Sequence, residues 1–113
     1  METSSIDAAI REFRPNQGDW RSLETLFTQA FASSDPKRFY DAIFHLFERY
    51  AQEDASGVFW SALHGMEAVG GYEELLVRRF KSAPSFMTRV MLRRILNAGQ
   101  THIGELAISG LIE

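Results

Sequence analysis

Three residues with side chains suited to chemistry lie close together in the middle of the chain. Trp60, His64 and Glu67 are spaced i, i+4 and i+7, which places them on one line of a helix. They could form a functional cluster in which Glu67 orients His64, and a small hydrolase built on these two residues is our third hypothesis. We favour a structural interpretation, because buried polar groups usually serve to be hydrogen-bonded to each other or to an arginine.

A second polar line follows on a later segment. Arg89, Arg93 and Asn97 are spaced i, i+4 and i+8, and Arg94 adjoins them. Because a guanidinium suits planar, bidentate pairing with a carboxylate, we predict that an arginine of this segment forms a fork with Glu67. Asn97 is predicted to cap a neighbouring backbone group. Glu67, Arg93, Arg94 and Asn97 therefore make up a predicted structural polar network.

A third set of residues is acidic and aromatic. Asp41 and Glu48 lie two turns apart on one side of a predicted helix, and Tyr50 lies close to the acidic turn that follows it. A solvated face is the usual role of such acids. An inhibitor of a basic protein also needs them, because charge speeds encounter and aromatic anchors slow release. We predict a partner-binding surface made of Asp41, Glu48, Tyr50, Glu53, Asp54, Trp60 and His64.

The composition is that of one globular domain over residues 1–113. The chain is 45% hydrophobic and 24% charged, which is enough to build a core without metal or disulfide support. The chain has no cysteine, so disulfides, thiolate catalysis and cysteine-based zinc sites are excluded. No apolar run approaches the roughly 20 residues of a membrane span, and the first residues do not form a secretory signal. We expect a cytoplasmic protein that does not act at a membrane.

Metal, phosphate and nucleic-acid signatures are not found in the sequence. His45, His64 and His102 are far apart, and there is no HExxH motif, EF-hand loop, phosphate loop or GxSxG motif. Residues 78 to 94 hold six of the twelve basic groups and no acidic one, but the net charge of −3 and the pI of about 5.6 disfavour a phosphate ligand. We expect no cofactor, no metal, no nucleic-acid partner and no enzymatic activity.

Helical spacing of apolar residues and local stop signals define the elements that position these groups. Asp35 followed by Pro36 is the clearest predicted start, with Asp35 as N-cap, and Gly70-Gly71 is a strong predicted stop. Ser4 or Ser5, Asp19 and Thr101 are further predicted caps. No segment alternates as a strand does. We expect an all-α fold of about seven short helices in antiparallel hairpins, as a compact bundle or a HEAT-like stack, at about 5–13, 20–31, 36–52, 58–69, 72–82, 84–97 and 101–111.

Two of these predicted helices have broad apolar faces. The helix over 36–52 carries two apolar lines, wider than one core-facing stripe requires, so it is either central or shared with a partner. In the helix over 84–97, six apolar residues are predicted to point inward: Phe86, Met87, Val90, Met91, Ile95 and Leu96.

The last half of the chain resembles a group of small all-α bacterial immunity proteins, which neutralise polymorphic or contact-dependent toxins. The motifs that carry this resemblance are His64-Gly65 with Glu67, Gly71-Tyr72-Glu73, Pro84, Arg94-x-x-Asn97 and Gly99.

The resemblance implies a cytoplasmic protein that binds a cognate toxin domain and blocks its active site or an essential surface. It implies no catalytic residue, and it assigns the motif residues to the helical framework. If the toxin is a nuclease, the acidic surface would take the place of phosphate. The alternative is a HEAT-like helical scaffold or adaptor that organises protein partners without inhibiting them.

Overall fold

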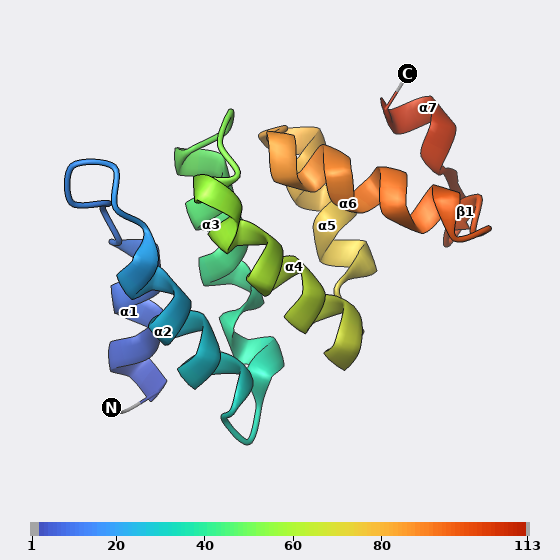
Figure 1. Ribbon diagram of the computed structural model, residues 1–113. Helices are drawn as coiled ribbons and strands as arrows, with labels where there is room; N and C mark the ends of the chain where they lie inside the picture. Colours follow the sequence, from blue (N-terminus) through green and yellow to red (C-terminus); the bar gives the residue numbers. More distant parts are fainter. Residues whose placement is uncertain (1–2, 113) are drawn as a thin grey trace.

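Three α-hairpins lie side by side in the computed structural model, which describes residues 3 to 112 (Figure 1). A short β-hairpin and a last helix follow them. The elements in order are α1 (Thr3–Arg11), α2 (Arg21–Phe31), the 3-10 turn η1 (Pro36–Phe39), α3 (Tyr40–Arg49), the 3-10 turn η2 (Ala55–Gly57), α4 (Val58–Val69), α5 (Glu73–Ser82), α6 (Phe86–Asn97), β1 (His102–Ile103), β2 (Leu106–Ala107) and α7 (Ile108–Ile112).

The helices of the three hairpins form two layers. In one layer α1 packs on α3 and α3 packs on α5, while in the other α2 packs on α4 and α4 packs on α6. The layer of α2, α4 and α6 faces the viewer in Figure 1. The predicted all-α fold in antiparallel hairpins is confirmed. Within residues 3 to 112, no helix has the length and apolar character needed to cross a membrane.

Helix α3 is the central helix of the stack. It contacts α1, α4, α5 and α6, so apolar side chains from both of its lines are buried. Tyr40 and Phe44 from one line are buried together with Ile43 and Phe47 from the other. The broad apolar face of this segment therefore serves the core of the chain itself.

An aromatic cluster joins the first two hairpins. The ring of Trp20 meets Tyr50 edge-on at 4.9 Å and Phe59 at 5.4 Å between ring centroids. Phe59 in turn lies 4.9 Å from Phe47. Such pairs contribute stability beyond their buried area, so the cluster fixes the start of α2 against α3 and α4.

Glycines end two helices where the sequence predicted an end. Gly70 and Gly71 have φ angles of 84° and 73° and follow the last residue of α4. The carbonyl of Gly70 also accepts a hydrogen bond of 2.7 Å from the Tyr40 hydroxyl, which anchors the turn to α3. Gly99, with a φ of 103°, follows the end of α6 at Asn97. A left-handed backbone is accessible to glycine at little cost, which explains both ends.

One of these predicted N-cap positions is confirmed, and the others are not. Helix α1 begins at Thr3, ahead of the predicted caps Ser4 and Ser5. Asp35 stands at the N-cap position and Pro36 follows it as the first residue of the turn, as predicted. The Asp35 side chain makes no capping hydrogen bond, and this first turn is a 3-10 turn that leads into α3. Asp19 lies one residue before the N-cap of α2, and its carboxylate accepts a 3.0 Å bond from the Arg21 backbone N–H.

A capping box opens α6 at Ser85. The Thr88 backbone N–H donates to Ser85 Oγ at 3.1 Å, and the Ser85 backbone N–H donates to Thr88 Oγ1 at 3.0 Å. Both residues are buried. Because two backbone donors at the helix start are satisfied in this way, α6 has a firmly defined beginning, with its N-cap directly after Pro84.

The predicted last helix over 101–111 was wrong. Residues 102 to 107 form an antiparallel hairpin in which Ile103 pairs with Leu106, and α7 begins only at Ile108. The two-residue turn has Gly104 first, with a φ of 62°, as a type II′ turn requires. Thr101 therefore caps no helix, and its carbonyl accepts from the Ile108 N–H at 2.9 Å. The hairpin and α7 lie beyond α5 and α6, against which they pack (Figure 1).

Candidate partner-binding surface

Asp41 and Glu48, two of the predicted partner contacts, form intramolecular ion pairs. Arg79 of α5 donates from Nε and Nη2 to the two carboxylate oxygens of Glu48, at 2.7 Å each. The same guanidinium pairs with Asp41 through Nη1. Asp41 also pairs with Arg11 of α1, with 2.9 Å between Nη2 and Oδ2. These four side chains link α1, α3 and α5.

The ion pairs offset the charge of this acidic face. The side chains of Arg79 and Glu48 are only 18% and 17% exposed, so solvent screens their attraction weakly. Partial burial raises the pKa of Asp41, but hydrogen bonding to Arg11 and the charge of Arg79 outweigh it and lower the pKa overall. Carboxylates that are already paired with cations attract a basic partner less than free ones would.

The other predicted contacts near the third helix have mixed surroundings. Tyr50 is half-buried in the aromatic cluster, with the Arg49 guanidinium 5.1 Å from its ring centroid. The Asp54 carbonyl accepts from the N–H groups of Gly57 and Phe59 and so holds the turn before α4. Glu53 is exposed and has no ion pair within the described part of the chain.

The line of Trp60, His64 and Glu67 lies on α4, in the other layer. Its carboxylate does not orient the imidazole: Arg94 donates from Nε and Nη2 to Glu67, at 2.8 Å and 2.9 Å. The predicted fork onto Glu67 is therefore present, and Arg94 makes it. His64 is exposed, and its ring lies 6.0 Å from that of Trp60 between centroids.

Two members of the predicted polar network do not take part in the Glu67–Arg94 ion pair. Arg93 and Asn97 are exposed, and neither side chain has a hydrogen bond or ion pair to another residue between 3 and 112. Asn97 therefore does not cap a neighbouring backbone group, as the sequence had predicted. The network reduces to Glu67 and Arg94.

Tyr72 lies near the fork at the start of α5. Burial is the main cause that raises its pKa to about 12, and the negative charges of Glu67 and Glu73 add to the effect. Tyr72 is buried, so it belongs to the core of the chain.

An apolar groove opens between α4 and α6, with a volume of about 370 Å³. Trp60, Phe86 and Val90 provide its apolar walls. Phe86 is 43% exposed, which is unusual for so large an apolar side chain. The prediction that Phe86 points into the core was wrong. The remaining residues that line the groove are Arg89, Arg93 and Arg94.

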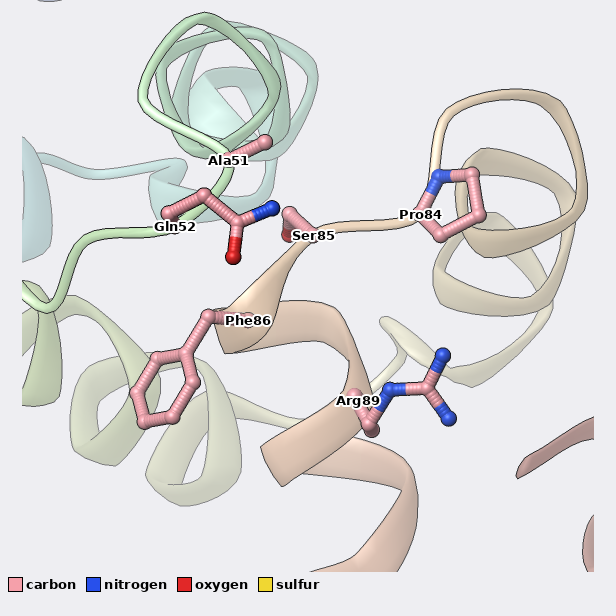
Figure 2. A pocket seen from close by; sticks show the side chains of 6 residues that line it. All are labelled: Ala51, Gln52, Pro84, Ser85, Phe86 and Arg89. Atoms are coloured by element: carbon pink, nitrogen blue, oxygen red, sulfur yellow. The ribbon is translucent and has the colours of Figure 1, made fainter. Parts of the chain in front are cut away.

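A second hollow of about 270 Å³ adjoins the groove at the start of α6. Figure 2 shows Gln52 and Ser85 facing this hollow, and the side chains of Phe86 and Arg89 extending in different directions from the first turns of α6. Phe86 and Arg89 line both hollows. The Phe86 backbone N–H donates to the Ala51 carbonyl at 2.6 Å, so the turn after α3 holds the backbone that carries this exposed ring.

The arginines of the groove differ in what they contact. Arg94 is paired with Glu67, whereas Arg89 donates to the Ile112 carbonyl at 3.1 Å and lies 5.2 Å from the Phe80 ring centroid. Those partners of Arg89 are uncharged. Arg93 has no carboxylate partner within the described residues. The groove therefore carries two guanidinium charges that no ion pair offsets over residues 3 to 112.

A close approach between α2 and α4 accounts for Gly65. A Cβ atom at this position would lie 2.6 Å from the ring of Phe31, so glycine allows that ring to rest against α4. Ser61 donates to Glu24 at 2.7 Å beside this contact. Gly65 therefore has a framework role that its neighbours explain.

Comparisons of the chain with models of known protein families, with curated proteins and with solved structures find no match. The resemblance to immunity proteins thus stays a prediction. Several positions of its motifs have roles in the framework: Glu67 joins α4 to α6, Gly71 follows the end of α4, and Gly99 follows the end of α6.

Proposed function

We propose that this chain is an immunity-type protein, which binds a cognate bacterial toxin domain and neutralises it by covering its active site or an essential surface. The observation that carries the proposal is the groove between α4 and α6, where Phe86 lies exposed beside Trp60 and two arginines without carboxylate partners among the described residues. Aromatic and arginine side chains supply most of the binding energy in protein interfaces. The resemblance of the last half of the chain to immunity proteins supplies the class of partner.

The layer of α2, α4 and α6 is the contact face in this proposal. Trp60 and His64, which belong to the sequence-predicted contact set, lie on it. Asp41 and Glu48 lie on α3, in the opposite layer, and their charges are offset by Arg79. The proposal therefore moves the centre of the interface from the acidic face of α3 to the groove.

Co-expression with the toxin domain encoded beside this chain tests the proposal. Growth rescue and co-purification are the two readouts. We expect wild-type chain to rescue growth, and Phe86→Ala combined with His64→Ala to weaken co-purification by about tenfold or more, as loss of an interface anchor does. Lys81→Ala, which changes an exposed residue on α5, is the matched control. Wild-type chain that neither rescues growth nor retains the toxin domain contradicts the proposal.

The architecture favours a second candidate, a HEAT-like scaffold or adaptor. Stacked helical hairpins in two layers are the plan of repeat proteins that hold partners on an extended surface. An inhibitor abolishes the activity of the purified toxin at one equivalent, whereas a scaffold binds its partners and leaves their activity unchanged. Titration of the toxin with the full chain separates the two functions.

A further inference from the structure

We infer that the groove between α4 and α6 binds an acidic segment of the partner, with apolar side chains on one face and carboxylates beside them. The inference rests on the proposed function and names the chemistry of the partner at this site. It follows from three observations: an exposed aromatic ring, an apolar groove, and cationic groups that line it with uncharged partners or none among residues 3 to 112.

The apolar part of the ligand is set by Trp60, Phe86 and Val90. These side chains come from two neighbouring helices, and the Glu67–Arg94 fork ties those helices together. Arg94 also lies 5.7 Å from the Trp60 ring centroid, which restricts that ring before anything binds. A groove that is already ordered loses less entropy on binding, so leucine or phenylalanine side chains of a partner can be buried there at low cost.

The charge of the ligand is set by Arg89 and Arg93. Residues 86 to 97 contain no acidic side chain, and the Arg89 guanidinium contacts a backbone carbonyl and an aromatic ring, both uncharged. A guanidinium binds a carboxylate through two parallel hydrogen bonds, which is stronger than a bond to a neutral acceptor. A lysine-rich segment in the same place would bring like charges together.

This chemistry is the reverse of what the acidic composition suggested. The sequence predicted a basic partner held by Asp41 and Glu48, yet both carboxylates contact Arg79 in the structure. The positive groove lies in the other layer, on the side of α4 and α6. The part of the toxin that enters the groove is therefore acidic even where the toxin as a whole is basic.

Two fluorescent peptides of about 16 residues, roughly four helical turns, test the inference. They share one apolar face of leucine and phenylalanine, and their remaining positions are glutamate in one peptide and lysine in the other. Fluorescence anisotropy with the full chain gives the Kd of each. We expect the glutamate peptide to bind at least about tenfold more tightly at low salt, and the preference to shrink as salt is added.

Matched variants assign the effect to the groove. Arg93→Glu should weaken binding of the glutamate peptide about fivefold and strengthen binding of the lysine peptide, as reversal of one exposed charge does. Arg78→Glu, which reverses an exposed charge on α5, should change neither Kd by as much. Phe86→Ala should weaken the binding of both peptides. Circular dichroism establishes that each variant keeps the helical fold.

Several outcomes would overturn the inference. They are equal binding of the two peptides, binding of neither, or an Arg93→Glu variant that behaves as Arg78→Glu does. A concentration-dependent dimer that Phe86→Asp abolishes would assign the groove to a second copy of this chain. Growth rescue distinguishes the failure of the two proposals. If wild type and Arg93→Glu rescue equally, the inhibitor role stands and the groove assignment fails. If wild type does not rescue growth, the inhibitor role alone is removed.

Discussion

Arg94 holds Glu67 at two points, with Nε 2.8 Å from Oε2 and Nη2 2.9 Å from Oε1, and so ties α6 to α4. Both oxygens of Glu67 are engaged by this guanidinium, which also lies over the Trp60 ring. One ion pair thus fixes a wall of the groove. His64, three residues before Glu67, remains exposed on the same helix.

Removing this fork should destabilise the fold modestly. Arg94→Ala should lower the free energy of unfolding by about 1 kcal/mol, because the pair is bidentate but its side chains are 40% and 28% exposed. Urea denaturation measures the change. Arg93→Ala is the matched control, since it removes an exposed arginine without an ion pair in the described structure, and should stay within about 0.5 kcal/mol of wild type. A larger loss for Arg93→Ala would contradict the assignment of the fork to Arg94.

Arg79 should matter more than Arg94. It pairs with both Asp41 and Glu48, and its removal leaves the mostly buried Glu48 without an ion pair among residues 3 to 112. Arg79→Ala should cost about 2 kcal/mol, since unpaired buried charge is strongly destabilising and this site is partly solvated. Arg78→Ala, one position away and exposed, should cost less than about 0.5 kcal/mol. Thermal unfolding compares them, and equal melting temperatures for the two variants would count against the network.

Acid should weaken the link between α1, α3 and α5. The pKa of Asp41 is lower in the folded chain than its ordinary value of 3.8, so the folded state favours the charged carboxylate. Its contribution to stability is therefore present above about pH 4 and is lost as the pH falls through the lowered pKa. The difference in melting temperature between wild type and Asp41→Asn should be clear at pH 7 and shrink towards pH 2. A difference that grows on acidification would show the opposite linkage. Asp35→Asn, at an exposed aspartate, is the control.

The capping box at α6 should contribute measurable stability. Ser85→Ala should cost about 1 kcal/mol, because it leaves the Thr88 backbone N–H without its acceptor at a buried position. The melting temperature should fall by about 4 °C for a domain of this size. Ser82→Ala, at an exposed serine of the preceding helix, is the comparison. If Ser85→Gly were as destabilising as Ser85→Ala, the loss would not be that of a cap, since glycine is tolerated there.

Local signals predicted much of the helical framework. The ends of α4 and α6 followed from Gly70 and Gly99, because glycine takes a left-handed backbone that other residues avoid. The C-terminal hairpin was not predicted, because the left-handed backbone at Gly104 was not recognised from the sequence. Ile103 and Leu106 fit a helical line as well as they fit two short strands, and only the left-handed Gly104 decides between them.

The site was harder to predict than the framework. Phe86 and Met87 are both apolar neighbours on α6, and the packing of that helix on α3, α4 and α5 buries Met87 and exposes Phe86. Sequence spacing cannot choose between two apolar lines of one helix. Arg79 and Asp41 are 38 positions apart in the sequence, so no local pattern could predict that they form an ion pair. The offset of the acidic charge by an arginine of the same chain was therefore not predictable.

The β-hairpin and α7 cover one side of the third helical hairpin. In repeat proteins, the outer face of the last helical pair could pack against a further unit, and capping segments with a polar outer face cover it. Here α7 packs on α6 and β1 packs on α5, so residues 102 to 112 occupy that flank. A further helical pair therefore cannot pack directly on α5 and α6 where β1 and α7 already lie.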